Sequence, residues 1–495
     1  MKENKGITLI ALIITIILLL ILVGVSINLA IKGNLFGSAE KAVSGTNDKV
    51  AQEQTRVDEL MEEWNKLEQE QCVHTWGEEK ITKAATCTET GTKTRTCTKC
   101  GKVETLTIQA LGHNYVSGKC TRCNENEPKE KLPEIEAGTR ATEPSEYKSN
   151  NKTAVIPAGF TVSGISTEQS IDGGLVIYDI PEGRTVNWTN PDSVKTKYNQ
   201  FVWIPVEVNK TTEPKDTETS IASFYRAAWA NNASTGGERT TGLNTGYTEP
   251  YSYDSSDYDG TGTGKTGISA QITELTKSIY KYGGFYIGRY EAGSETKRGD
   301  VSSQTAAFVV QQDKYPYNYV EWGKGMGDVS EGAVYLSNSL YTGKTGYGVK
   351  SMLCTGAAWD SMLDFIKDSS HNVTSSSSWG NYYDSDTYKV YRGSLYSNST
   401  WSAADTTNGS DVTKDTSILL TTGATERNSS KNIYDVAGNC LEWTTEANNT
   451  IGRVVKGGHY NYILGSSHAA SYRNFGRPTD SSNNVSFRPL LYVAL

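Results

Sequence analysis

The most apolar stretch of the 495-residue chain lies near its N-terminus, where no charged residue interrupts the segment from Ile7 to Ile31. A helix of about 25 residues, rising 1.5 Å per residue, is long enough to cross the roughly 30 Å apolar core of a bilayer. The pattern therefore predicts a leader and membrane-embedded helix over residues 1–31. Because Lys2 and Lys5 precede the apolar run, a secretory signal peptide is the alternative.

Apolar residues then recur at helical spacing along a charged segment. Val50, Val57, Leu60, Trp64 and Leu67 are separated by seven, three, four and three positions, and Glu and Lys stand between them. This spacing places the five side chains along one stripe of a helix, which predicts a helical stalk over residues 32–71. The stripe either pairs with a partner helix or packs on its own chain.

The long C-terminal region alternates short β-type runs with long polar loops. The runs are AVIPAGFTV, GGLVIYDI, QFVWIPVEV and GGFYIGRYEAG. One helix is predicted in TGAAWDSMLDFIKD, where Trp359, Met362, Leu363 and Ile366 fall on one face after the N-cap residue Thr355. Together with the N-terminal helices, this pattern predicts the α+β class.

Charge and composition divide the chain and exclude one class of partner. The formal net charge is −8, and Lys and Arg do not cluster, which argues against nucleic acid as a partner. The Glu-, Lys- and Pro-rich run 124–151 has few large apolar residues and predicts an extended linker. The expected organisation is 1–31 leader and anchor, 32–71 stalk, 72–123 cysteine–histidine module, 124–151 linker and 152–495 main domain.

Six of the eight cysteines lie in the cysteine–histidine module. The pairs Cys97/Cys100 and Cys120/Cys123 have the spacing of a zinc ribbon, which predicts one structural zinc site. A second site would use the remaining candidates, which are Cys72, His74, Cys87 and His113. Sequence does not fix the pairing, because Cys87 or His113 could instead join the first CxxC. Disulfides in an oxidising exterior are the alternative, but they have no use for the two imidazoles.

The same segment, AATCTETGTKTRTCTKCGKVETLTIQALGHNY, resembles a small module common in surface proteins of Gram-positive gut bacteria. Its role there is that of a spacer. The resemblance implies a stapled segment between an anchor and a larger domain, with no catalytic part of its own.

The N-terminal text KGITLIALIITIILLLILVGV resembles type IV prepilins and pseudopilins. The resemblance implies cleavage between Gly6 and Ile7 by a dedicated peptidase. In that family a glutamate stands five residues after the cut and neutralises the N-terminal amine of a neighbouring subunit. Ala11 stands there in this chain, which puts filament assembly in doubt more than membrane insertion.

The main domain resembles the formylglycine-generating enzymes and their sulfatase-modifying-factor relatives. The matching segments, in order, are FVWIPVEV, GGFYIGRYEAG, LCTGAAWDSMLDFI, IYDVAGNCLEWTTE, RVVKGGHYNY and SFRPLL. The resemblance implies a variant of the C-type lectin fold. Those enzymes act through two cysteines placed after the GG motif, yet no cysteine lies between Gly458 and Phe487. We therefore expect no catalysis, and we expect Cys354 and Cys440 to be buried and unreactive.

The same resemblance raises the question of metal sites in the main domain, of calcium first and of iron second. The family's GNVWEW turn helps to bind calcium, so Asn439 and Glu442 in GNCLEW are calcium candidates. Alternatively, Asn439 caps the turn and Glu442 pairs with an arginine. An iron-binding histidine triad, as in another relative, is not expected from His371, His459 and His468.

The last segment, GGHYNYILGSSHAASYRNFGRPTDSSNNVSFRPLL, is rich in Tyr, Asn, Ser, His and Arg. Such residues suit a binding surface, because Tyr supplies large area at low entropic cost while Ser and Asn adapt their hydrogen bonds. It also resembles the variable region of proteins diversified by retroelements. The candidates for ligand contact are Tyr460, Asn461, Tyr462, His468, Tyr472, Arg473 and Asn474.

These features predict a membrane-anchored bacterial surface protein, a non-catalytic adhesin whose C-terminal domain binds an extracellular glycan or protein. It would lie in the cell membrane with this domain outside, or at a pilus-associated surface with pilin-like subunits as partners. The alternatives are a minor pilin or pseudopilin of a secretion or uptake filament, and an enzyme of the sulfatase-modifying-factor superfamily with an unrecognised activity.

Overall fold

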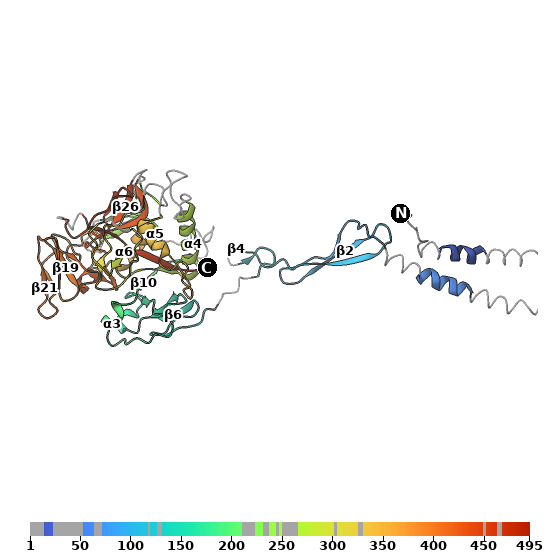
Figure 1. Ribbon diagram of the computed structural model, residues 1–495, viewed down its shortest axis with the longest axis horizontal. Helices are drawn as coiled ribbons and strands as arrows, with labels where there is room; N and C mark the ends of the chain where they lie inside the picture. The colour runs from blue at the N-terminus through green and yellow to red at the C-terminus, as the bar shows by residue number, and fades with distance from the viewer. Residues whose placement is uncertain are drawn as a thin grey trace, which may run out of the picture. The chain divides into compact units, whose positions relative to one another are not determined.

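The chain divides into two compact units, Met1–Glu127 (unit 1) and Pro128–Leu495 (unit 2). The computed structural model (Figure 1) describes most of both units. The described residues are 14–22, 53–63, 72–116, 119–125, 131–209, 223–230, 237–243, 247–249, 266–300, 304–324, 330–448, 452–462 and 468–495.

The N-terminal part of unit 1 contains two described helical segments, 14–22 and 53–63. Among the described residues, no helix is long and apolar enough to cross a membrane. The expected cleavage site at Gly6 and Ile7, and most of the expected anchor, lie outside the described residues. On the second helical segment Val57 and Leu60 are exposed, whereas Val50, Trp64 and Leu67 also lie outside the described residues.

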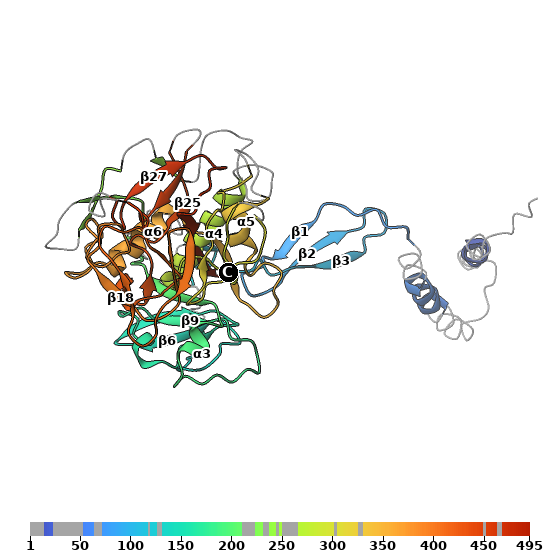
Figure 2. The same ribbon diagram turned by 60° about the vertical axis from the view of Figure 1, so that its left-hand side comes forward.

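The rest of unit 1 is built from short antiparallel strands. A three-stranded sheet has the order β1 (Lys80–Lys83), β2 (Gly91–Thr96) and β3 (Val103–Ile108), as Figure 2 shows. A hairpin of β4 (Tyr115–Val116) and β5 (Lys119–Cys120) follows. Alternating Thr and charged residues make β2 a strand with neither face fully buried, so the sheet brings little apolar surface to stabilise itself.

Unit 2 is centred on a six-stranded antiparallel sheet. Its order is β17 (Val349–Leu353), β29 (Pro489–Val493), β14 (Gly284–Gly288), β10 (Gln200–Pro205), β9 (Val176–Tyr178) and β8 (Thr161–Val162). Residues 200–204 of β10 are all buried, as are all of β14 and β29. These continuous apolar runs indicate strands covered on both faces, and the β-type runs predicted from sequence are confirmed.

A second sheet carries the C-terminal candidate residues. Its order is β13 (Tyr247–Thr248), β25 (Leu441–Asn448), β26 (Gly452–Lys456) and β27 (Arg473–Gly476), and β28 (Val485–Phe487) pairs in parallel with β25. Residues 441–447 of β25 are all buried, although they include Glu442 and Glu446. Charged side chains in such a strand must find partners inside the protein.

Few helices accompany these sheets in the described part of unit 2. They are α3 (Asp192–Lys195), α4 (Thr266–Tyr282), α5 (Gly332–Ser339) and α6 (Gly356–Ile366), together with two short 3-10 turns. Helix α6 is the predicted one: the Thr355 side chain accepts a hydrogen bond from Ala358 N at 3.0 Å, and the apolar face of the helix is buried. It packs against β10 and β25 near the centre of unit 2 (Figures 1 and 2).

Small hairpins account for most of the remaining strands. They are β6/β7 (Ser145–Ser149, Lys152–Ile156), β11/β12 (Ala228–Ala230, Glu238–Thr240), β15/β16 (Gly293–Ser294, Tyr315–Pro316), β18/β21 (Tyr388–Val390, Ser410–Val412), β23/β24 (Ser429–Ser430, Ile433–Tyr434), and β20, β19 and β22 (Thr400–Ala403, Ser394–Ser397, Leu419–Leu420).

The expected α+β class, with a transmembrane pilin-like helix and a C-type lectin-like domain, was wrong. The described residues are mostly strands with few helices, and no described helix could span a membrane. The expectation rested partly on two N-terminal helices, the anchor and the stalk. The structure describes only residues 14–22 of the first and 53–63 of the second. It also treated many Ser-, Thr- and Gly-rich segments as loops, although they form short strands that are paired in small sheets.

The expected linker 124–151 also differs from the structure. Residues 131–151 belong to unit 2: β6 pairs with β7, and Ala141 and Tyr147 are buried in its core. In β6 the burial alternates, with Ser145 and Tyr147 inside and Lys148 exposed. Within β6, the charged residues Glu146 and Lys148 are thus the less buried half of a period-two pattern.

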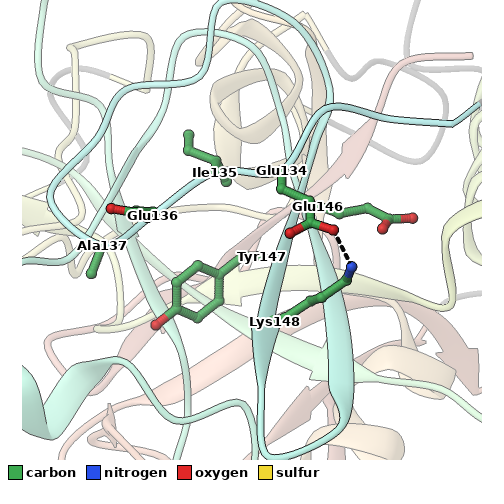
Figure 3. Close-up of a pocket in the computed structure, with 7 residues that line it drawn as sticks. All are labelled: Glu134, Ile135, Glu136, Ala137, Glu146, Tyr147 and Lys148. Atoms are coloured by element: carbon green, nitrogen blue, oxygen red, sulfur yellow. Dashed lines mark hydrogen bonds and ion pairs between the residues drawn. The ribbon is translucent and has the colours of Figure 1, made fainter.

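This segment lines a hollow of about 330 Å³, formed by residues 134–137 and 146–148. Figure 3 shows Lys148 paired with Glu134 at one side of it, while Tyr147 and Ile135 lie nearby. The ion pair engages the one basic side chain of the lining, Lys148, and one of its three glutamates, Glu134.

A buried charge network joins β13 and residues 223–230 to the start of α6. Glu249, with a side chain 5% exposed, accepts hydrogen bonds from Gly356 N at 2.9 Å and Ala357 N at 3.1 Å. The Arg226 guanidinium lies 3.9 Å from Glu249 and 3.4 Å from Glu446. Burial, followed by repulsion from Glu446, raises the pKa of Glu249 to about 7.

This raised pKa predicts a pH-dependent stability. Since the folded protein holds the proton of Glu249 more tightly than the unfolded chain, the contribution is complete below the usual pKa of 4.5 and is lost as the pH rises through about 7. The free energy of unfolding should fall by up to about 3 kcal/mol across this window. A Glu249→Gln variant should show a flatter dependence in urea unfolding at a series of pH values. Equal slopes for the two proteins would contradict the assignment.

Candidate metal centres and ligand-binding surface

The first cysteine–histidine cluster lies at the turn between β2 and β3. It consists of Cys72, His74, Cys97 and Cys100, whose ligand atoms all lie within 4.8 Å of one another. The sulfurs of Cys72 and Cys97 are 3.9 Å apart, and Cys100 Sγ lies 3.4 Å from His74 Nδ1. Three thiols and one imidazole thus converge on one point.

The second cluster repeats this arrangement around the β4/β5 hairpin. It consists of Cys87, His113, Cys120 and Cys123, again within 4.8 Å of one another. The sulfurs of Cys87 and Cys120 are 3.5 Å apart, and Cys123 Sγ lies 3.4 Å from His113 Nδ1. Each cluster therefore offers the same three sulfurs and one nitrogen to a metal ion.

This pairing differs from the expected zinc ribbon, in which the two CxxC pairs share one ion. Each CxxC instead has a cluster of its own, completed by one further cysteine and one histidine. A repeat in the sequence signals this arrangement: His74-x-Trp76 precedes the first CxxC, and His113-x-Tyr115 precedes the second. In both cases the aromatic ring packs on the imidazole, with ring centroids 4.8 Å and 5.1 Å apart.

The two CxxC turns also have the same backbone geometry. Cys97 N donates to Lys102 O and Gly101 N donates to Cys97 O, at 2.8 and 2.9 Å. In the second turn Cys120 N donates to Glu125 O and Asn124 N to Cys120 O, both at 2.8 Å. The residue after each CxxC has a positive φ, 74° for Gly101 and 62° for Asn124, which Gly and Asn tolerate best.

These turns prepare one thiolate in each cluster. Burial opposes ionisation of Cys97, but hydrogen bonds from the backbone N–H groups of Cys100 and Lys99 outweigh it and lower its pKa to about 5. In Cys120 burial is likewise outweighed by the N–H groups of Arg122 and Cys123, and its pKa falls to about 5. Because thiolates are the metal-binding form of cysteine, both turns favour metal ligation.

The clusters suit a metal ion better than disulfides. Each holds three cysteines, so one disulfide would leave an odd thiol and an unused imidazole. All eight cysteines are free in the structure. The cysteine–histidine clusters could therefore hold a metal ion, as the sequence predicted in outline.

The two calcium candidates have other partners. Both carboxylate oxygens of Glu442 accept hydrogen bonds from Arg488, at 2.6 and 2.9 Å, and both side chains are fully buried. The Asn439 Oδ1 atom accepts from Asn381 Nδ2 and Leu420 N, at 2.9 and 3.0 Å. These oxygens accept hydrogen bonds from protein donors, so the two residues do not fit a calcium site well. The Glu442–Arg488 pair is the arginine pairing that the sequence analysis gave as the alternative to calcium.

The two cysteines of unit 2 are buried. Cys354 and Cys440 have no exposed surface, and burial raises the pKa of each thiol well above its usual range. The histidines do not form a metal group either: in the described residues His371 contacts Asp368, while His459 and His468 stack on Tyr462.

The ligand-contact candidates fall into two groups. Tyr460 is buried, and its hydroxyl accepts a hydrogen bond from Asn483 at 2.9 Å. Arg473 pairs with Asp360 at 2.9 Å and Glu446 at 3.0 Å inside the protein. The side chains of these two residues are engaged by contacts within the protein. Asn461 is exposed, and the other candidates, Tyr462, His468, Tyr472 and Asn474, are half-buried.

Stacked rings order this surface. Tyr462 lies between His459 and His468, with ring centroids 3.7 and 3.9 Å away, and His468 contacts Tyr472 at 4.4 Å. Burial, followed by the nearby His468, lowers the pKa of His459 to about 3, so its imidazole is neutral. We name His459, Tyr462, His468 and Tyr472 the ring stack. Sequence analysis missed His459 as a member, because its role appears only through contact with Tyr462.

Comparisons with known proteins add little. No protein-family model matches the chain, and no curated protein matches it. Two of the solved structures that match are Treponema denticola variable protein 1, with 13% identity over 42% of this chain and 84% of that one, and the crystal structure of CarF, with 14% identity over 43% and 87%. Both TM-scores are 0.25, too low to support an argument, so the prepilin and formylglycine-generating-enzyme resemblances stay predictions.

Proposed function

We propose that the chain is a non-catalytic binding protein of the bacterial surface and that unit 2 carries its ligand-binding site at the ring stack. The observation that supports this most is the sandwich of Tyr462 between two imidazoles. A tyrosine held in this way loses little conformational freedom when a ligand binds. The binding free energy that its contacts supply is therefore reduced little by the entropic cost of ordering the side chain.

The surroundings of the ring stack also suit recognition. Asn474 Nδ2 lies 3.5 Å from the Tyr462 hydroxyl, and Asn461, which precedes Tyr462 in the chain, is exposed. Amide groups next to half-buried rings can make directional hydrogen bonds around an aromatic anchor. The missing cysteines after Gly458 support a binding role over the oxidation of a substrate cysteine. Anchoring at the membrane through the apolar run 7–31 rests on the sequence alone, and the filament and enzyme alternatives also remain predictions.

We propose zinc as the metal of both clusters. A tetrahedral zinc ion with Zn–S of about 2.3 Å and Zn–N of about 2.0 Å places two sulfurs about 3.8 Å apart and a sulfur and nitrogen about 3.5 Å apart. The clusters have sulfur pairs at 3.9 and 3.5 Å and sulfur–nitrogen pairs at 3.4 Å. With all four positions taken by protein atoms, zinc would be structural, and the module would act as a stapled spacer.

Binding by the full chain on an array of glycans and surface proteins tests the proposed site. A Tyr462→Ala variant should weaken binding at least tenfold, about 1.4 kcal/mol, since it removes the central ring of the stack. Tyr335→Ala is the matched control, because Tyr335 is 38% exposed on α5 and lies outside the ring stack. Equal affinities for both variants would count against the site, provided that their melting temperatures match.

A further inference from the structure

The aromatic surface continues beyond the last segment of the chain. His459 contacts Tyr460 with ring centroids 6.1 Å apart, and Tyr396 and Trp401 pack against the cluster that contains Tyr460. Trp401 lies 5.4 Å from Tyr396 and 5.0 Å from Tyr315, again between ring centroids. Tyr315, Tyr396 and Trp401 are half-buried. Together with the ring stack they form an aromatic band, with Tyr460 as its buried middle.

The band is assembled from segments far apart in sequence. Tyr315 comes from β16, Tyr396 and Trp401 face each other across the β19/β20 hairpin, and the ring stack follows β26. A row that three parts of the chain build together is held more rigidly than a single loop would be. It presents a series of rings to a ligand, which suits an extended molecule.

Amide side chains accompany the rings. Asn483 Nδ2 donates to the Tyr460 hydroxyl at 2.9 Å, and Asn484 Nδ2 lies 3.0 Å from His459 Nε2. Asn474 contacts the Tyr462 hydroxyl in the same manner. All three asparagines are half-buried. The polar groups along the band are therefore amides, phenols and imidazoles.

No member of the band or its three asparagines carries a carboxylate, an ammonium or a guanidinium group. Two basic residues next to band residues in sequence are paired with acids: Arg473 with Asp360 and Glu446, and Lys314 with Glu295. The charge pattern thus complements an uncharged ligand. The rings and asparagines of the band offer no ionic partner to a charged peptide or an acidic polymer, so contact with them would cost such a ligand hydration without compensation.

We propose that the aromatic band binds a neutral polysaccharide chain along the rings from the ring stack to Trp401. The C–H groups of a pyranose ring pack on aromatic surfaces, while its hydroxyls need the donors and acceptors that amides and phenols supply. Because both faces of Tyr462 are covered by imidazoles, its edge and hydroxyl would meet the sugar. This inference rests on the proposed binding function and adds two things to it: the class of ligand and the part played by β19/β20.

The test measures binding of the full chain to soluble neutral polysaccharides, namely mannan, galactan and glucan, beside polyuronic acids and surface proteins. Trp401→Ala and Tyr462→Ala should each weaken binding to a neutral polysaccharide at least tenfold. Trp401→Phe, which keeps a ring, should retain most of it, and Tyr335→Ala should bind normally. Because neither partner is charged, affinity should not change between low and high salt.

Each other outcome has a definite meaning. If Tyr462→Ala abolishes polysaccharide binding while a well-folded Trp401→Ala does not, the band ends at the ring stack and the inference is overturned. If the chain binds only proteins or polyuronic acids, with loss in Tyr462→Ala, the ligand class is wrong and the proposed function stands. Failure to bind any probe would overturn both.

Discussion

A Cys97→Ser variant is expected to bind one metal ion per chain, whereas two are expected for the unaltered protein, one in each cluster. Cys97 contributes a thiol whose pKa is lowered to about 5, and no atom of the second cluster comes from the first CxxC. Because structural zinc supplies on the order of 10 kcal/mol of folding free energy to small domains, the loss should unfold the segment around β1–β3. Metal content per chain, measured by atomic emission, gives the result.

Two matched variants sharpen this experiment. Cys120→Ser should likewise leave one ion, now in the first cluster, and Cys97→Ser with Cys120→Ser should leave none. Cys354→Ala changes a buried cysteine of unit 2 and should leave both ions in place. In cobalt-substituted protein both sites should show the same spectrum, that of three sulfurs and one nitrogen. Two different spectra, one of them that of four sulfurs, would instead show that the two CxxC pairs share one ion. That result would refute the pairing in which each CxxC has a cluster of its own.

The composition of these clusters could be predicted from sequence, but the pairing could not. CxxC spacing and interleaved histidines identify all eight residues of the two clusters, since few other uses combine thiols with imidazoles at such spacing. The pairing depends on which cysteines and histidines strands β2 and β3 bring close to each CxxC. The spacing of the residues in the sequence does not determine this. The repeated His-x-aromatic motif, at His74 and His113, was the one local signal that pointed to it.

The same division holds in unit 2. Apolar runs such as 200–205 and the capped helix at Thr355 were visible, because burial imposes a pattern on neighbouring residues. The partners of Asp360, which are Lys456 at 3.2 Å and Arg473 at 2.9 Å, lie about a hundred positions away and leave no local pattern. Arg473 was therefore assigned to the ligand surface, although its charge serves the interior.

Replacing Glu442 with alanine is expected to cost about 3–5 kcal/mol of unfolding free energy, whether or not calcium is present. The change leaves the Arg488 guanidinium fully buried without its carboxylate, and an unpaired buried charge is among the most destabilising defects known in proteins. Arg488 would keep only the carbonyl oxygens of Gly288 and Tyr434, at 2.8 Å each. Urea unfolding, followed by tryptophan fluorescence in calcium and in EGTA, measures the loss.

A double substitution separates the ion pair from a metal site. Glu442→Leu with Arg488→Met fills a similar volume without charge, and apolar replacements of buried ion pairs are often neutral or better. We expect it to recover much of the stability that Glu442→Ala loses. If calcium instead raises the unfolding free energy of the unaltered protein and of neither variant, Glu442 is a calcium ligand in solution. Arg488 would then have to release the Glu442 carboxylate, because in the structure both carboxylate oxygens accept hydrogen bonds from the guanidinium.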